Sequence, residues 1–151
     1  MGVSRNITLE VYTKLETSYC LIREILLGLW FKDEEFSVRT FYKDSTDNDD
    51  LTDFMNFYKI EQILDERDSL FKRNEITVNV DELNEGLIIK SKKLTNSFNS
   101  DMKFELYFSP GGNHTLEKFS RNTDFSYYLN LILPQIEKIG HTTKIECLDF
   151  G

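Results

Sequence analysis

An acidic stretch contains the first residues whose types and spacing could do chemistry. Residues 44–53 hold five carboxylates and no basic side chain: Asp44, Asp47, Asp49, Asp50 and Asp53. Carboxylate oxygens gathered in a short loop are the ligands that Ca²⁺ prefers. Counted from Asp47, however, the fifth and sixth positions are Leu51 and Thr52, where an EF-hand loop needs an oxygen ligand and then Gly. We therefore interpret this stretch as a solvated polar loop and not as a calcium site.

The thiol and imidazole groups are widely separated along the chain. They belong to Cys20, Cys147, His114 and His141. A zinc centre needs three or four such ligands, and neither a CxxC motif nor a His pair at helical spacing occurs. Both cysteines lie in apolar patterns, which favours free buried thiols over a disulfide. We predict no metal centre and no cofactor, and we interpret His141 as a residue at the end of a helix.

Phosphate binding and acid–base hydrolysis also lack the pattern that each requires. Residues 109–114 form the only Gly-rich turn, but no Lys ends it and no helix follows at once. Hydrolysis by paired carboxylates needs one carboxyl group with a raised pKa in a dry pocket, beside another that stays ionised. The acidic residues here lie in polar runs or on the outer side of a predicted helix. We therefore name no catalytic residue and predict a binding protein instead of an enzyme.

Negative charge is unevenly distributed along the sequence. The formal net charge is −8 and the sequence pI is near 4.8, which argues against a protein that binds nucleic acid through a basic face. Residues 33–85 carry 16 acidic and 6 basic side chains, whereas the remainder carries 10 and 12. This distribution predicts one acidic surface that could bind a basic partner, and a surface that only maintains solubility is the alternative.

The elements that must position these residues follow from the spacing of apolar side chains. Alternation predicts strands, and apolar residues three or four apart predict helices. Strands are expected at residues 6–15, 36–43, 76–81, 87–94, 102–108 and 144–150. Helices are expected at 17–31 and 125–140, and residues 51–71 fit either one helix or a bent pair of helices. We expect one α+β domain over residues 1–151, with a mostly antiparallel sheet of about six strands packed against two or three helices. The sequential strands between 76 and 108 indicate a meander.

The helix at residues 17–31 is apolar around most of its circumference. Such a helix must be covered on most sides, so we predict that it is the central core helix, with Thr17 or Ser18 as its N-cap. It is too short to span a bilayer. In the helix at 125–140, Pro134 should cause a kink or a restart.

The helix predicted at residues 51–71 carries a second group of acidic side chains. Its polar side is expected to hold Asp65, Glu66 and Asp68, beside Asp53 and Glu61. The aromatic residues interleaved with these acids are Phe54, Phe57 and Tyr58, which either anchor a partner or pack in the core. The predicted partner-binding residues are therefore Asp44, Asp47, Asp49, Asp50 and Asp53, followed by Asp65, Glu66 and Asp68.

In size, in acidic charge and in its segment from Asp44 to Asp53, the chain resembles the small immunity proteins that bacteria keep against their own toxins, many of which are basic nucleases. The resemblance is one of type and rests on no aligned motif. It implies stoichiometric binding to a cationic toxin domain, with acidic side chains lying where the phosphates of a substrate would lie. No charged and apolar leader opens the chain, so we expect a cytoplasmic protein, with neither nucleic acid nor a membrane as its partner.

Two other classes of function remain open from the sequence. A general interaction or adaptor module could bind a partner through a sheet edge, without preference for basic surfaces. A small-ligand carrier or an enzyme with an unfamiliar site would need a deep apolar pocket near His114 or His141. The first alternative differs from electrostatic docking in its response to salt, because pairing at a sheet edge depends little on ionic strength.

Overall fold

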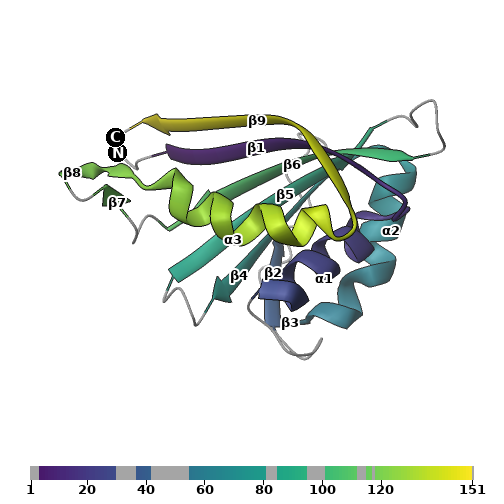
Figure 1. Cartoon of the computed structure of the whole chain (residues 1–151). Helices are drawn as coiled ribbons and strands as arrows, with labels where there is room; N and C mark the ends of the chain where they lie inside the picture. Colours follow the sequence, from purple (N-terminus) through teal and green to yellow (C-terminus); the bar gives the residue numbers. More distant parts are fainter. Residues whose placement is uncertain are drawn as a thin grey trace.

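The computed structural model describes residues 4–29, 37–41, 55–80, 85–94, 101–111, 115–116 and 118–150. Its main feature is an antiparallel sheet in the order β3-β2-β4-β5-β6-β1-β9 (Figure 1). The strands of this sheet are β1 (Ser4–Thr13), β2 (Ser37–Phe41), β3 (Met55–Asn56), β4 (Arg73–Val80), β5 (Glu85–Lys93), β6 (Met102–Pro110) and β9 (Gly140–Phe150). The helices α1 (Ser18–Leu29) and α3 (Phe125–Glu137) lie on one face of the sheet, and α2 (Glu61–Ser69) contacts both α1 and β4.

The predicted α+β class is confirmed. The meander is confirmed as well, because β4, β5 and β6 pair in sequence order. A separate two-stranded sheet, made of β7 (Thr115–Leu116) and β8 (Phe119–Thr123), had no counterpart among the predicted strands. Its first strand has only two residues, too few to produce an alternating pattern.

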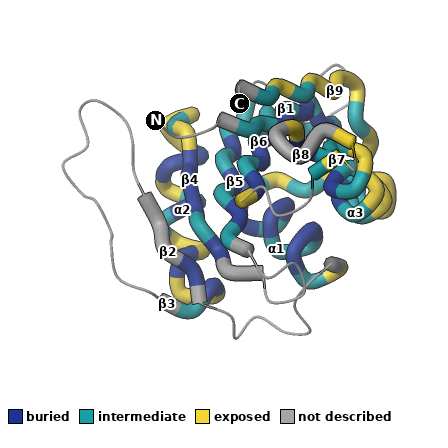
Figure 2. The backbone as a smooth tube through the Cα atoms, turned by 90° about the vertical axis from the view of Figure 1, so that its left-hand side faces the viewer, coloured by how far each residue is buried: buried dark blue, intermediate teal, exposed yellow. Residues whose placement is uncertain are grey.

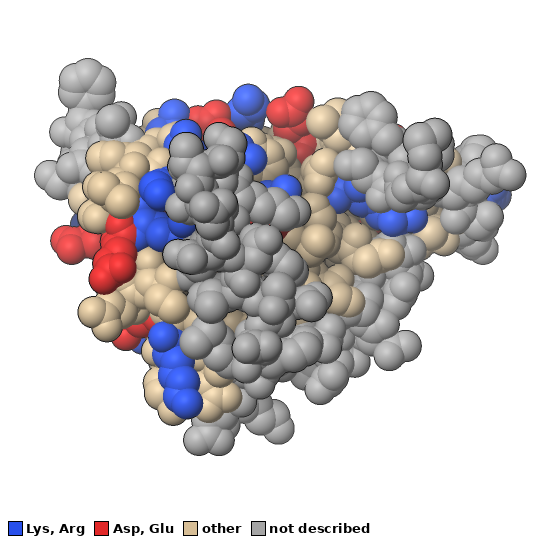
Figure 3. Space-filling model, turned by 180° about the vertical axis from the view of Figure 1, so that it is seen from behind, with Lys and Arg blue, Asp and Glu red and all other residues tan. Residues whose placement is uncertain are grey.

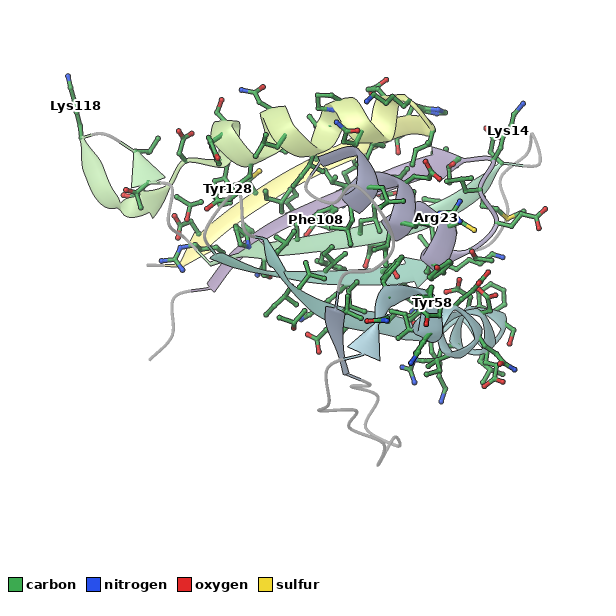
Figure 4. All side chains as sticks on the ribbon, turned by 90° about the horizontal axis from the view of Figure 1, so that it is seen from below. Lys14, Arg23, Tyr58, Phe108, Lys118 and Tyr128 are labelled. Carbon is green, nitrogen blue, oxygen red and sulfur yellow. The ribbon has the colours of Figure 1, made fainter. Side chains whose placement is uncertain are left out.

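The core lies between the sheet and the helices. Alternate residues of the adjacent strands β1 and β6 are fully buried on the helix side, namely Ile7, Leu9 and Val11 of β1 and Phe104, Leu106 and Phe108 of β6. Figure 2 shows the buried positions along the inner strands and α1, and Figure 4 shows Phe108 and Tyr128 in the interior between sheet and helices. Each such side chain contributes roughly 1.5–3 kcal/mol by leaving water, so this layer is the main source of stability.

Helix α1 occupies the central place that its composition predicts. Tyr19, Ile22, Ile25 and Leu26 are buried, and the helix contacts α2, α3 and β5. The predicted N-cap is confirmed, because the Thr17 hydroxyl accepts a hydrogen bond from the Cys20 amide at 3.1 Å. Of the described residues, no helix is long and apolar enough to cross a membrane.

The helix predicted over residues 51–71 is wrong at Met55–Asn56. Residues 51–54 lie outside the described part of the chain, Met55–Asn56 forms β3 against β2, and a 3₁₀ turn, η1 (Phe57–Ile60), leads into α2. Phe57 is buried and stacks on Tyr19 with ring centroids 4.7 Å apart, so it belongs to the core. Pairing with β2 holds the backbone extended at Met55, and this tertiary interaction overrides the helical spacing.

The last helix and strand differ from the prediction at their junction. Asp124 caps α3 by accepting from the Tyr127 amide at 3.3 Å, and the helix continues past Pro134 to Glu137. Strand β9 then begins at Gly140, four residues earlier than expected. A Cβ atom at Gly140 would collide with the carbonyl oxygen of Tyr12, so the close approach of β9 to β1 requires glycine there.

Candidate partner-binding site

The eight carboxylates predicted to bind a partner fall into two groups. Asp44, Asp47, Asp49, Asp50 and Asp53 lie outside the described residues, as does Phe54. Asp65, Glu66 and Asp68 all lie on α2, but the structure does not bring them to one surface. Asp68 faces inward, Asp65 is half-buried and Glu66 is exposed.

The expectation that Asp68 lies on the polar side of its helix is wrong. Only 3% of the residue is exposed, because it follows Ile60 and Leu64 at intervals of four and shares their buried side. Its carboxylate accepts hydrogen bonds from the Ser18 amide at 2.6 Å and from the Ser18 hydroxyl at 2.7 Å. Asp68 therefore supports the first turn of α1 from a distance of 50 residues in sequence, and we remove it from the candidate surface.

Two further side chains complete the buried network around Asp68. The Asn74 amide donates to the Asp68 carboxylate at 3.0 Å, and the Arg67 guanidinium donates to the Asn74 side-chain oxygen at 3.2 Å. Arg67 also donates to the backbone carbonyl of Arg73 at 2.8 Å. These bonds join α1, α2 and β4, so the inner side of α2 has a structural role.

The electrostatics of α2 follow from this burial. Desolvation raises the pKa of Asp68 above its ordinary value, although hydrogen bonds from Ser18 and Asn74 oppose the rise. Partial burial likewise raises the pKa of Asp65, and the neighbouring charge of Asp68 adds to the effect, while Lys93 acts in the opposite direction. Two carboxyl groups on the same helix thus hold their protons more tightly than usual.

The outer side of η1 and α2 has a different composition. It exposes three large apolar side chains, with 49% of Tyr58, 65% of Leu70 and 51% of Phe71 accessible. The acidic residues Glu61 and Glu66 are exposed on the helix between them. We call these five residues of the η1–α2 segment the α2 surface, and Figure 4 shows Tyr58 beside the helix. The exposed Lys59 places one positive charge in the same segment, with its ammonium 5.9 Å from the centroid of the Tyr58 ring. Exposed aromatic and apolar side chains next to charges are typical of protein-binding surfaces.

The end of α2 holds one of these aromatic residues in an unfavourable backbone conformation. The amides of Phe71 and Lys72 donate to the carbonyls of Asp68 and Arg67 at 2.9 and 3.0 Å, which is the Schellman arrangement at a helix end. The residue directly after the C-cap is usually Gly in that arrangement, yet here it is Phe71 with φ 54°. A side chain in this left-handed region costs roughly 1–2 kcal/mol. About half of Phe71 is exposed, so burial of its ring does not fully offset this cost.

Among the described residues, the face of the sheet opposite α1 and α3 carries charges of both signs. Glu10 on β1 lies 2.7 Å from the Lys103 ammonium and 4.0 Å from that of Lys144, and Lys90 lies 3.4 Å from Glu75. The hydrogen bond with Lys103 lowers the pKa of Glu10 and raises that of Lys103. Figure 3 shows acidic and basic side chains interspersed on this side of the molecule. The charges of these described residues largely compensate one another within each pair.

The described residues as a whole do not carry the acidic surplus. They hold 16 Lys and Arg against 15 Asp and Glu, whereas the rest of the chain holds 2 against 11. The negative net charge therefore belongs to the segments outside the described ranges, chiefly residues 31–36 and 42–54.

The described cysteine and histidine residues that were considered for metal or nucleophilic chemistry do not form one cluster. Cys20 and Cys147 are free thiols, as predicted, although both are only partly buried, and burial raises the pKa of Cys147. His141 does not lie at a helix end but in β9, and its ring stacks on that of Tyr12 with ring centroids 5.6 Å apart. His114 lies outside the described residues. In the part of the chain that the structure describes, no three His, Cys, Asp or Glu residues are placed to hold a metal ion.

Comparisons with protein-family models, with curated proteins and with solved structures find no match to this chain.

Proposed function

We propose that the protein acts by binding a basic protein partner through the α2 surface and the acidic segment that precedes it in the sequence. The observation that carries this proposal is that Phe71, exposed and in a left-handed backbone conformation, ends the same segment that exposes Tyr58, Leu70, Glu61 and Glu66. Apolar side chains that lose their water on binding supply affinity, and carboxylates supply selectivity and a faster approach of the partner.

The chain order supports the inclusion of the acidic segment. Asp53 precedes Met55 by two residues and Tyr58 by five, so the segment with Asp44, Asp47, Asp49 and Asp50 joins the chain directly ahead of η1. A partner in contact with Tyr58 therefore lies near the residue at which the acidic segment joins the described chain. A cationic surface gains from such a concentration of negative charge.

The class of protein that fits this proposal best is the toxin-immunity type, with a basic nuclease domain as the partner. In that role the acidic side chains occupy the positions that substrate phosphates would take, and the apolar residues of the α2 surface hold the complex together. The protein would then act in the cytoplasm by stoichiometric binding, without catalysis and without a cofactor.

The proposal is tested with proteins encoded by the neighbouring genes, because an immunity gene should lie directly after its toxin gene. Each neighbouring product is expressed separately and titrated with this chain in low-salt buffer by calorimetry. We expect a 1:1 complex with a product that is basic, weakening as salt is raised. If no basic neighbour binds at low salt, the immunity role is wrong.

A binding partner that attaches equally well at low and high salt would favour the adaptor alternative. The variant Phe71→Ala separates the two cases, with Leu116→Ala on β7 as a matched control for the loss of an exposed apolar side chain. Binding through the α2 surface is weakened by the first change and not by the second.

A further inference from the structure

Strand β9 forms a long open edge of the main sheet. It has 11 residues, and within the described residues it pairs with β1 on one side only. The opposite edge is β3, which has two residues. Short strands are one of the ways in which proteins protect sheet edges, and a long strand with free amide and carbonyl groups is a template for further pairing. The two edges of this sheet are therefore protected unequally.

The side chains of β9 are unusually exposed for a strand next to the core. Ile145 is 48% and Leu148 is 42% exposed, and Figure 2 shows the strand as mainly exposed and intermediate positions. Ile145 pairs with Leu9, whose side chain faces the helices, whereas Lys144 and Glu146 pair with Glu10 and Thr8 and lie on the other face. The edge thus presents an apolar residue between two opposite charges.

We propose that β9 pairs antiparallel with β9 of a second copy of this chain, about a twofold axis at Ile145. In this register the two Ile145 residues are opposite each other, and Lys144 of each copy is opposite Glu146 of the other. Opposite charges across an antiparallel pair stabilise it, and apolar residues directly opposite shield each other from water. The two sheets become one continuous sheet, with the helices of both copies on the same face.

Charge complementarity selects this register over its neighbours. A twofold axis moved by one residue places Lys144 opposite Lys144 or Glu146 opposite Glu146, and like charges directly opposite are destabilising. The bulge in β9 falls at Thr143, because Lys144 is opposite Glu10 and Thr142 is opposite Val11. Regular pairing about the axis is therefore confined to residues 144–146, which contain both charge pairs.

This dimer is independent of the proposed partner and compatible with it. Three strands, β5, β6 and β1, separate β9 from β4, which is the strand that α2 contacts. Pairing at β9 therefore leaves the α2 surface of each copy accessible, and the dimer has two of them.

The test uses charge exchange in the full-length chain, with mass in solution measured by sedimentation over a range of concentrations. The wild type is expected to be a dimer that dissociates on dilution. Lys144→Glu and Glu146→Lys each create two like-charge pairs and should raise the dissociation constant about tenfold or more. The double variant restores both pairs with reversed polarity and should return the constant to within about threefold of wild type.

Two results would overturn the inference. One is a wild-type chain that stays monomeric at all concentrations, and the other is a dimer that the single charge changes do not weaken. If a single variant fails to fold, amide hydrogen exchange of the wild type tests the pairing at β9. Amides within residues 144–146 must become more protected as the protein concentration rises, and unchanged protection contradicts pairing at β9.

Discussion

The two sides of α2 use the same residue type for opposite purposes. On the inner side, Asp68 is buried and accepts hydrogen bonds from Ser18 and Asn74, which tie α1 and β4 to the helix. On the outer side, Glu61 and Glu66 are exposed beside Tyr58, Leu70 and Phe71. An acidic helix is therefore not one surface, because a buried carboxylate supports the fold and an exposed carboxylate is available to a partner. Inner changes should alter stability, and outer changes should alter binding.

The largest change in the free energy of unfolding is expected from a substitution on the inner side of α2. Asp68→Ala leaves the Ser18 amide and hydroxyl and the Asn74 amide without their acceptor, so unfolding should become easier by about 2–3 kcal/mol. Urea unfolding followed by circular dichroism measures the change. The matched variant Glu66→Ala, two residues earlier on the exposed side, should change the free energy of unfolding by less than about 0.5 kcal/mol. Equal losses in the two variants would remove the distinction between the sides.

The end of α2 offers a change that moves stability and binding in opposite directions. Phe71→Gly removes the side chain from a left-handed backbone conformation and should stabilise the fold by about 1 kcal/mol relative to Phe71→Ala, which keeps the strain. Both variants lose the aromatic ring and should bind the partner more weakly. Thermal unfolding gives the first quantity and calorimetry the second. A Gly variant no more stable than the Ala variant would show that Phe71 is unstrained.

A smaller change in the stability of the folded protein is expected when the pH is changed. Because burial raises the pKa of Asp68 and Asp65, the folded protein holds these protons more tightly than the unfolded chain. Their contribution to stability is fully present in acid and is lost as the pH rises above about 4 and through the folded pKa values. Glu10 has the opposite sign, because its lowered pKa makes its contribution disappear only in acid.

Urea unfolding at pH 5 and pH 8 measures this dependence, with Asp68→Asn as the comparison. The wild type should lose more stability between the two pH values than the Asn variant, which has no proton to release at that position. If the two proteins respond alike, the buried network does not control the titration of Asp68.

The sequence predicts the outer side of α2 better than the inner side. The class of fold, the central helix at 17–31 and the meander all follow from apolar spacing, which is a local property. Asp68 also had a local signal, since it follows Ile60 and Leu64 at intervals of four, but a carboxylate on an apolar side is expected to be solvated unless its partners are known. Those partners, Ser18 and Asn74, come from other elements and leave no pattern near Asp68.

Other features could not be read from the sequence for physical reasons. The positive φ of Phe71 has no signal, because Gly is the residue that normally marks a helix end of this kind. Met55–Asn56 is extended only because β2 lies beside it, so its own spacing pointed to a helix. Both are tertiary effects, in which a neighbouring element decides the local conformation.

The central claim is that the outer side of α2 binds a basic protein, and the most direct test is the rate of association. The rate for the basic partner is measured by stopped flow, in low and high salt, for the wild type and for a chain with Glu61→Lys and Glu66→Lys. Glu137→Lys, an exposed charge reversal on α3, is the control. We expect the double reversal to slow association at low salt by about tenfold or more, with little effect in the control. A double variant that associates as fast as the wild type would contradict the claim.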